Sequence, residues 1–141
     1  MIMIKTINRL IDACEERRKG YETAANNVEN PTAAEVFRNL AFQSKSFQGQ
    51  LIPLVATAHS ETEEHKIEDA FINWMDFKSD IPSTDCNGII DFCEVGEKTT
   101  IAVYEEALES MLTDAPLRVV KDQLLSMKNT LELLNELKQK G

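Results

Sequence analysis

Four glutamates accompany two short segments that are nearly identical in sequence. The segments are Ile11-Asp12-Ala13-Cys14-Glu15 and Ile90-Asp91-Phe92-Cys93-Glu94, and the glutamates in and beside them are Glu15, Glu16, Glu94 and Glu97. A bundle that binds a pair of iron or manganese ions uses one glutamate from each of two helices and a Glu-x-x-His pair from each of the other two. The repeated segment therefore raises a di-metal carboxylate site as the first chemical hypothesis.

The remaining ligands of such a site are missing. The chain contains no Glu-x-x-His, and its two histidines, His59 and His65, lie in the connection between the two halves. At the constant offset of the repeat, Arg18 takes the position that Glu97 takes in the second copy, and the matching level of the second helix offers only Gln43-Ser44-Lys45-Ser46. We therefore predict no metal site, no cofactor and no catalytic residue.

The matching level of the last helix can be placed in two registers. Alignment of Arg38–Gln43 with Arg118–Gln123 points to Gln123 and Ser126, whereas counting from the turn points to Lys128 and Leu131. Neither register supplies a ligand pair, and both stay open at this point.

Arg18 and Glu97 each interrupt an otherwise apolar ladder. A charge on such a seam is costly unless it is paired, so we predict an Arg18–Glu97 ion pair in the middle of the bundle, with Gln43 and Tyr21 completing the hydrogen bonds. In the alternative, the long stem of Arg18 carries its guanidinium to solvent at the edge.

Glu94 and Glu97 could also act as an acid/base pair, but a solvated Glu94 beside a paired Glu97 is the simpler interpretation. No serine or cysteine is accompanied by a histidine on the buried seam of a helix, and no phosphate-binding glycine loop is present.

The positions of apolar residues predict helices throughout and no strand. Apolar residues recur every three or four positions, as on the buried stripe of a helix in a bundle. Asn30-Pro31 separates the first two helices, with Thr32 and Glu35 as an expected capping box. The second and fourth helices can run parallel because a long crossover joins them. We expect one all-α domain over 1–141, an up-down-down-up four-helix bundle with a short extra helix in the crossover that adds Phe71 and Trp74 to the core. The expected helices are 3–29, 32–59, 63–79, 84–112 and 115–139.

The amino-acid composition limits the classes of partner that the protein is expected to bind. The chain has 141 residues, 43% of them apolar, and a net charge of −9 with a pI near 4.7. Such an acidic chain is poorly suited to nucleic acid or to an anionic membrane. No signal peptide or membrane span is visible. The three cysteines Cys14, Cys86 and Cys93 form no CxxC and are expected as free thiols, which indicates the cytoplasm.

Several short motifs together resemble a bacterial family of ferritin-like four-helix-bundle domains without an assigned function. They are Cys14-Glu15-Glu16 leading to Gly20-Tyr21, Phe37-Arg38 with Gln43, Trp74-Met75-Asp76 with Lys78-Ser79, and Cys93-Glu94-Val95-Gly96-Glu97 leading to Tyr104-Glu105-Glu106. The resemblance implies a ferritin-like bundle. By analogy it also implies a non-catalytic, stress-related module that acts through self-association, for example as a homodimer, or through a protein partner. The alternative is an atypical iron or manganese protein that uses Glu97, Glu94, Glu15 or Glu16.

Overall fold

Four long helices make up the described part of the chain. The structure is a computed structural model that describes residues 2–58, 86–110 and 112–140. The helices are α1 (Ile2–Asn27), α2 (Pro31–Ala58), α4 (Cys86–Leu108) and α5 (Asp114–Lys140). No strand occurs among these residues, so the predicted all-α, four-helix architecture is confirmed. The expected helix at 63–79, with Phe71 and Trp74, and both histidines lie outside the described residues.

The turn between α1 and α2 is closed by Asn30. The side-chain oxygen Oδ1 of Asn30 accepts a hydrogen bond from the backbone N–H of Ala33 (3.0 Å), and its carbonyl accepts one from Ala34 (2.9 Å). Pro31 takes the first helical position, where its missing N–H would have no partner in the helix. The expected capping box on Thr32 and Glu35 is therefore wrong, because the helix begins before Thr32 and Asn30 is its cap.

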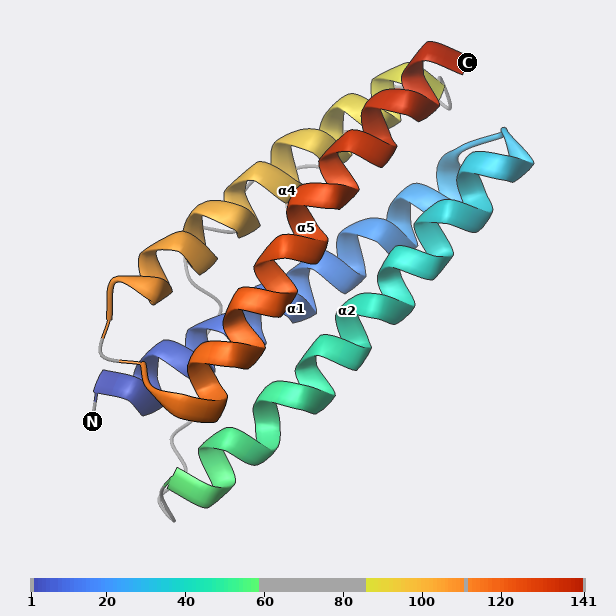
Figure 1. Cartoon of the computed structure of the whole chain (residues 1–141). Coiled ribbons are helices and arrows are strands. Elements are labelled where there is room, and N and C mark those ends of the chain that lie inside the picture. The colour runs from blue at the N-terminus through green and yellow to red at the C-terminus, as the bar shows by residue number, and fades with distance from the viewer. Residues whose placement is uncertain (1, 59–85, 111, 141) are drawn as a thin grey trace.

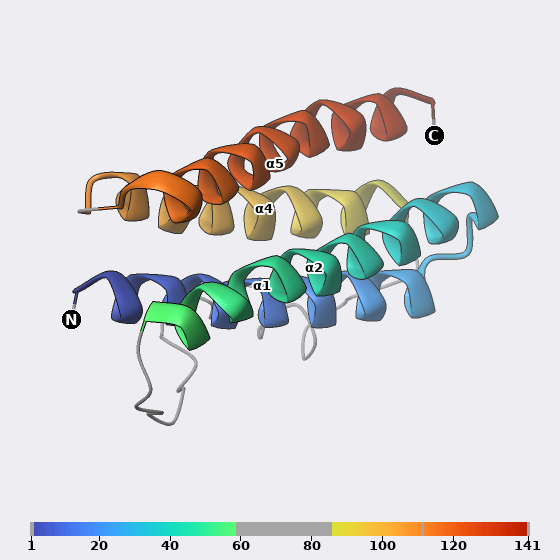
Figure 2. The same cartoon turned by 60° about the horizontal axis from the view of Figure 1, so that its bottom comes forward.

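The four helices run in two opposite directions, as both views show (Figures 1 and 2). α1 and α5 run one way, and α2 and α4 run the other way. α1 packs most extensively against α2, α4 packs against α5 and α1 against α4, and the contact between α2 and α5 is smaller than these. The chain thus forms two antiparallel hairpins, α1–α2 and α4–α5, held together mainly across α1 and α4.

The core consists of two apolar clusters. One contains Leu10, Cys14, Leu51, Tyr104 and Met127, among others. The other, on the side of the α1–α2 turn, contains Tyr21, Phe37, Ile90, Cys93 and Leu134. The isoleucine and cysteine of each repeated segment are buried, so the repeat marks core positions. The buried polar residues Arg17, Ser44, Glu97 and Thr100 belong to neither cluster and form a polar layer.

The outer faces of the helices carry charge. Arg9 pairs with Glu106 (Nη1–Oε1 2.6 Å), and Lys128 pairs with Glu105 (Nζ–Oε2 3.4 Å). None of the helices that the structure describes combines the length and the apolar content that crossing a membrane requires.

Candidate functional site: a buried ion pair and a surface groove

The polar layer is built around an ion pair between Arg17 of α1 and Glu97 of α4. Both side chains are completely buried. The guanidinium donates from Nε to Oε1 (3.0 Å) and from Nη2 to Oε2 (2.9 Å) of Glu97, and from Nη1 to Oγ of Ser44 on α2 (2.8 Å). The hydroxyl of Tyr21 donates to Oε1 of Glu97 (2.7 Å). Three helices are thus joined through one carboxylate and one guanidinium.

The predicted pair of Arg18 with Glu97 is wrong. Arg18 points to the outside of α1, where its Nη2 donates to Oε2 of Glu15 (2.6 Å) and its Nη1 to Oε2 of Glu22 (2.9 Å). The arginine that reaches Glu97 is Arg17, one position earlier. One residue is about 100° of rotation on a helix, which is enough to move a side chain from the core to the edge.

Sequence reasoning missed Arg17, although a signal for it exists. Residues three and four positions apart are neighbours on a helix surface. The neighbours of Arg17 at these spacings are all small or apolar or aromatic: Ala13, Cys14, Gly20 and Tyr21. Those of Arg18 include Glu15 and Glu22, two acids at the spacing of surface ion pairs. The flanking residues therefore distinguish the buried arginine from the exposed one.

Aromatic rings and the carboxylate fix the charge of Arg17. Its Cζ lies 5.3 Å from the centre of the Tyr21 ring and 5.7 Å from that of Phe47, within the range of cation–π attraction. Burial lowers the pKa of Arg17, but the charge and hydrogen bonds of Glu97, together with Tyr21 and Cys14, more than offset it, and the net pKa is raised. Burial and the same carboxylate raise the pKa of Tyr21. The layer thus contains a charged pair and a neutral phenol.

A second buried network extends the polar layer to α5. The hydroxyl of Tyr104 donates to Oε1 of Gln123 (2.6 Å), and the sulfur of Cys14 lies 3.0 Å from the same hydroxyl. Because the only hydroxyl proton points to Gln123, the thiol of Cys14 is the donor in that contact. Nε2 of Gln123 donates to the carbonyl of Phe47 (3.1 Å) and to Oε1 of Gln50 (2.9 Å). Burial raises the pKa of Cys14 to about 11, so the thiol keeps its proton at neutral pH.

The polar residues named in advance on α2 and α5 take different positions. On α5, Gln123 is buried and bonded to Tyr104, whereas Lys128 is exposed and paired with Glu105. Gln43 was expected to bond the ion pair, but Ser44 does so. Oε1 of Gln43 is buried and accepts no hydrogen bond.

The candidate glutamates do not converge. Glu15 is held by Arg18, Glu97 by Arg17, and Glu94 by Lys138 at 3.0 Å. Glu16 is 1% exposed, neither of its oxygens has a hydrogen-bond partner, and Lys19 Nζ stands 4.0 Å away.

The residues at the bundle centre do not fit a metal pair. Within the described ranges, no three side chains of the types His, Cys, Asp and Glu form a group that could hold a metal ion. A di-metal centre needs several carboxylates free to coordinate two cations. At the centre of this bundle, both oxygens of the Glu97 carboxylate already accept hydrogen bonds. The positive charge of the Arg17 guanidinium beside it would also repel a metal cation.

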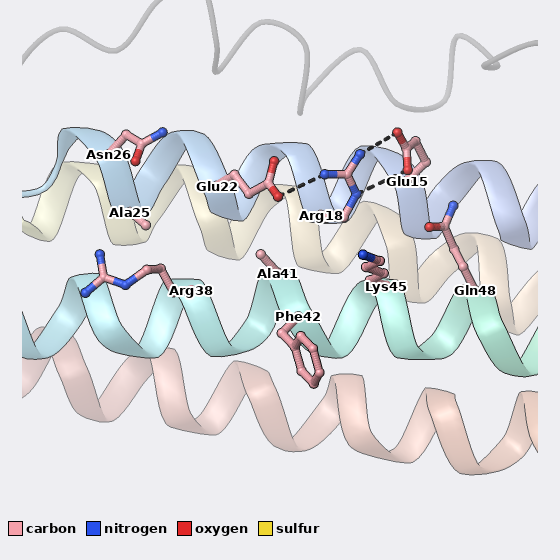
Figure 3. Close-up of a pocket in the computed structure, with 10 residues that line it drawn as sticks. All are labelled: Glu15, Arg18, Glu22, Ala25, Asn26, Arg38, Ala41, Phe42, Lys45 and Gln48. Atoms are coloured by element: carbon pink, nitrogen blue, oxygen red, sulfur yellow. Dashed lines mark hydrogen bonds and ion pairs between the residues drawn. The ribbon is translucent and has the colours of Figure 1, made fainter.

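A groove of about 790 Å³ runs along the outside of α1 and α2 (Figure 3). From α1 it is lined by the ion-paired cluster of Arg18, and from α2 by two cations and an exposed phenylalanine. Arg18 points from α1 toward Glu15 on one side and Glu22 on the other, as the dashed lines in Figure 3 mark. The main lining residues are Glu15, Arg18, Glu22, Arg38, Phe42 and Lys45.

Over residues 2–58, 86–110 and 112–140, these features define an all-α arrangement of four long helices with a closed polar centre. Residues 3–110 match the family described as Domain of unknown function (DUF2383). The match covers α1, α2 and α4 and most of the chain, so the protein belongs to this family. No curated protein matches the chain.

Proposed function

We propose that the protein is a non-catalytic, ferritin-like helical module that acts by associating with itself or with a protein partner. The observation that carries this proposal is the Arg17–Glu97 ion pair. A buried pair of this kind occupies the level of the bundle at which a di-metal protein would place its ligands. It links α1 to α4 and leaves neither partner free to react.

The saturation of the polar layer supports a structural role. Each guanidinium nitrogen of Arg17 donates a hydrogen bond, and both oxygens of Glu97 accept. A catalytic acid, base or nucleophile needs a reactive atom within reach of a substrate. The atoms of this layer are instead committed to one another and shielded from water, as expected of a network that specifies the packing of a core.

The ferritin-like assignment rests on topology. Two antiparallel hairpins with α2 and α4 running in the same direction agree with a bundle whose halves are joined by one long crossover. Residues 59–85 provide that connection in the sequence. Fold-level likeness carries no activity with it, so the function is argued from the centre and the surface.

The alternative function is an atypical iron or manganese carboxylate protein, and Glu16 is the observation that favours it. A buried carboxylate without a hydrogen bond is costly, and a cation would relieve that cost. A single carboxylate 4.0 Å from a lysine is a weak donor set, however, and the other three candidate glutamates are held by other cations.

Elemental analysis of protein purified without chelator separates the two functions. We expect iron and manganese far below one ion per chain. Stoichiometric metal that is lost in Glu16→Gln, but kept in the control Glu22→Gln, would establish the alternative and reject the non-catalytic module. Glu22 suits the control because its carboxylate lies on the same helix and is half-exposed.

The cellular setting is part of the same proposal. The net charge of −9 supports protein contacts over nucleic acid or anionic membranes. The odd number of cysteines, with Cys14 and Cys93 in separate core clusters, supports a reducing cytoplasm. A stress-related role follows from the resemblance, and survival of a deletion strain under oxidative and osmotic stress tests it.

A further inference from the structure

A small cavity lies between α1 and α4, at the end of the bundle where the chain turns from α4 toward α5. Its volume is about 40 Å³. The polar side chains that line it are Thr6 and Arg9 from α1, Glu106 from α4, and Ser110 from the turn after α4. A water molecule takes up about 30 Å³ in the liquid, so the cavity has room for one.

Arg9 brings a buried hydrogen-bond donor to this region. Its Nη1 donates to Oε1 of Glu106 (2.6 Å) at the surface. Its Nε is shielded from solvent and has no hydrogen-bond partner among the described residues. A buried N–H without an acceptor is costly and uncommon in folded proteins. An acceptor beside the Nε of Arg9 would therefore stabilise the fold.

The two hydroxyl groups in the cavity wall are too far apart for a good hydrogen bond. Oγ1 of Thr6 donates to Oγ of Ser110 over 3.4 Å, whereas a bond between hydroxyl groups is usually about 2.7–2.8 Å long. Each hydroxyl can donate one hydrogen bond and accept two. Both therefore keep the capacity to bond a third group that lies between them and Arg9.

We propose that one ordered water molecule binds in this cavity and joins α1 to the turn after α4. It accepts hydrogen bonds from the Nε of Arg9 and from one of the two hydroxyl groups. Its own protons go to the other hydroxyl and to the carboxylate of Glu106, which gives the three or four hydrogen bonds that are usual for a buried water. A halide ion could only accept, and it would lie beside the negative charge of Glu106. This inference is independent of the proposed function.

The bridge holds the turn between α4 and α5 in place. α4 ends at Leu108, and the backbone N–H of Ser110 donates to the carbonyl of Ala107 (3.0 Å), within the same segment. The side chain of Ser110 is what reaches across to Thr6 on α1. A bridging water is nearly as favourable as a direct hydrogen bond. Its loss should therefore loosen this turn more than the rest of the bundle.

A high-resolution crystal structure of the full chain tests the site directly. We expect a density peak about 2.7–3.2 Å from the Nε of Arg9 and from the hydroxyl of Thr6 or Ser110. Crystals soaked in bromide should show no anomalous peak there. A cavity without density overturns the inference. So does a bromide peak in the cavity, or an Arg9 side chain whose Nε donates directly to a protein acceptor.

A double-mutant cycle tests the same site in solution. Thr6→Val replaces the hydroxyl by a methyl group of similar size, and Arg9→Lys removes Nε but keeps a positive charge opposite Glu106. The hydroxyl and Nε make no hydrogen bond to each other, so a shared partner is what would couple them. We expect each variant to melt about 2–4 °C lower than wild type. The double variant should lose clearly less than the sum, and additive losses would overturn the shared water.

Thr23→Val is the matched control for Thr6→Val. Thr23 is another half-buried threonine of α1, and its hydroxyl donates to the carbonyl of Lys19 in its own helix (2.9 Å). Thr23→Val and Arg9→Lys should have additive effects on the melting temperature. Coupling in this pair as large as that between Thr6→Val and Arg9→Lys would mean that the cavity is not its source, and the inference would fail.

Amide hydrogen exchange shows where the bridge acts. In Thr6→Val, the amides of Glu109 and Ser110 should exchange about fivefold faster than in wild type, which matches the loss of one hydrogen bond. The control Thr23→Val should leave both amides unchanged. Equal acceleration along all four helices in Thr6→Val would indicate a general loss of stability and would overturn a bridge to this turn.

Discussion

Arg17 and Arg18 are adjacent in the chain and occupy opposite environments. Arg17 is buried at the bundle centre, paired with a carboxylate from another helix. Arg18 lies in the groove on the outside of α1, held by two glutamates of its own helix. Both make short charged hydrogen bonds, at 2.9 Å and 2.6 Å in the strongest ion pairs. The distances are alike, so the difference between the two residues is in their exposure to water.

The exposure of each ion pair to water decides how much it contributes to the stability of the fold. Removal of one partner from a buried pair leaves an uncompensated charge in the core, which typically costs about 3–5 kcal/mol. An exposed pair is screened by water and salt and contributes about 0–1 kcal/mol. The centre should therefore fix how α1 meets α4, whereas the groove is free to serve contacts with other molecules.

The largest expected effect comes from removing the buried cation. We expect Arg17→Met to lower the free energy of unfolding by about 3–5 kcal/mol, because Glu97 is left buried without its counter-charge. Urea unfolding followed by circular dichroism measures this. The double variant Arg17→Met/Glu97→Leu should recover most of the loss, because it removes both charges and keeps similar volume.

Arg18→Met is the matched control for that experiment. It deletes the same guanidinium one residue away, where the side chain is 25% exposed. A loss in Arg18→Met equal to that in Arg17→Met would show that burial does not separate the two residues.

The sequence predicts the helices better than it predicts the centre. The spacing of apolar residues, the breaks at Pro31 and Pro116 and the long connection between the two halves suffice to predict the four long helices. The choice between Arg17 and Arg18 is harder. A buried stripe that contains Cys14 and Tyr21 can include Arg17, three residues after Cys14, or Arg18, four residues after it. Only the side chains that neighbour each arginine on the helix surface show which of the two is buried.

The repeated segment also led to the wrong prediction of which arginine pairs with Glu97. Its constant offset matches Arg18 with Glu97, but equivalent positions in two copies need not touch each other. In the structure, the position equivalent to Glu97 faces the groove, and Arg17 crosses to Glu97 instead. The Cys14–Tyr104–Gln123 chain could not be predicted either, because it depends on how α1, α4 and α5 are placed around one another.

A smaller effect tests whether neutral buried groups behave like the ion pair. Tyr104→Phe removes the hydroxyl that lies between Cys14 and Gln123 and leaves Oε1 of Gln123 buried with one partner fewer. We expect a loss of about 1–3 kcal/mol in urea unfolding, the cost of an unsatisfied buried acceptor. A loss as large as that of Arg17→Met would mean that charge adds nothing to the cost of breaking the layer. Tyr21→Phe, which removes one of the donors to Glu97, is the companion measurement.

The smallest effect concerns the groove and depends on pH. Hydrogen bonds from Arg18 lower the pKa of Glu15 below its ordinary value of 4.5. A lowered pKa in the folded state stabilises the protein above the ordinary pKa, and this stabilisation is lost as the pH falls through the folded-state value. Arg18→Met should therefore be less stable than wild type by about 0–1 kcal/mol at pH 7. The difference should shrink below about pH 4 and should also shrink in high salt. Urea unfolding of both proteins between about pH 3 and pH 7 measures it, and a difference that stays constant on acidification would show that Arg18 stabilises the fold by packing and not by its charge.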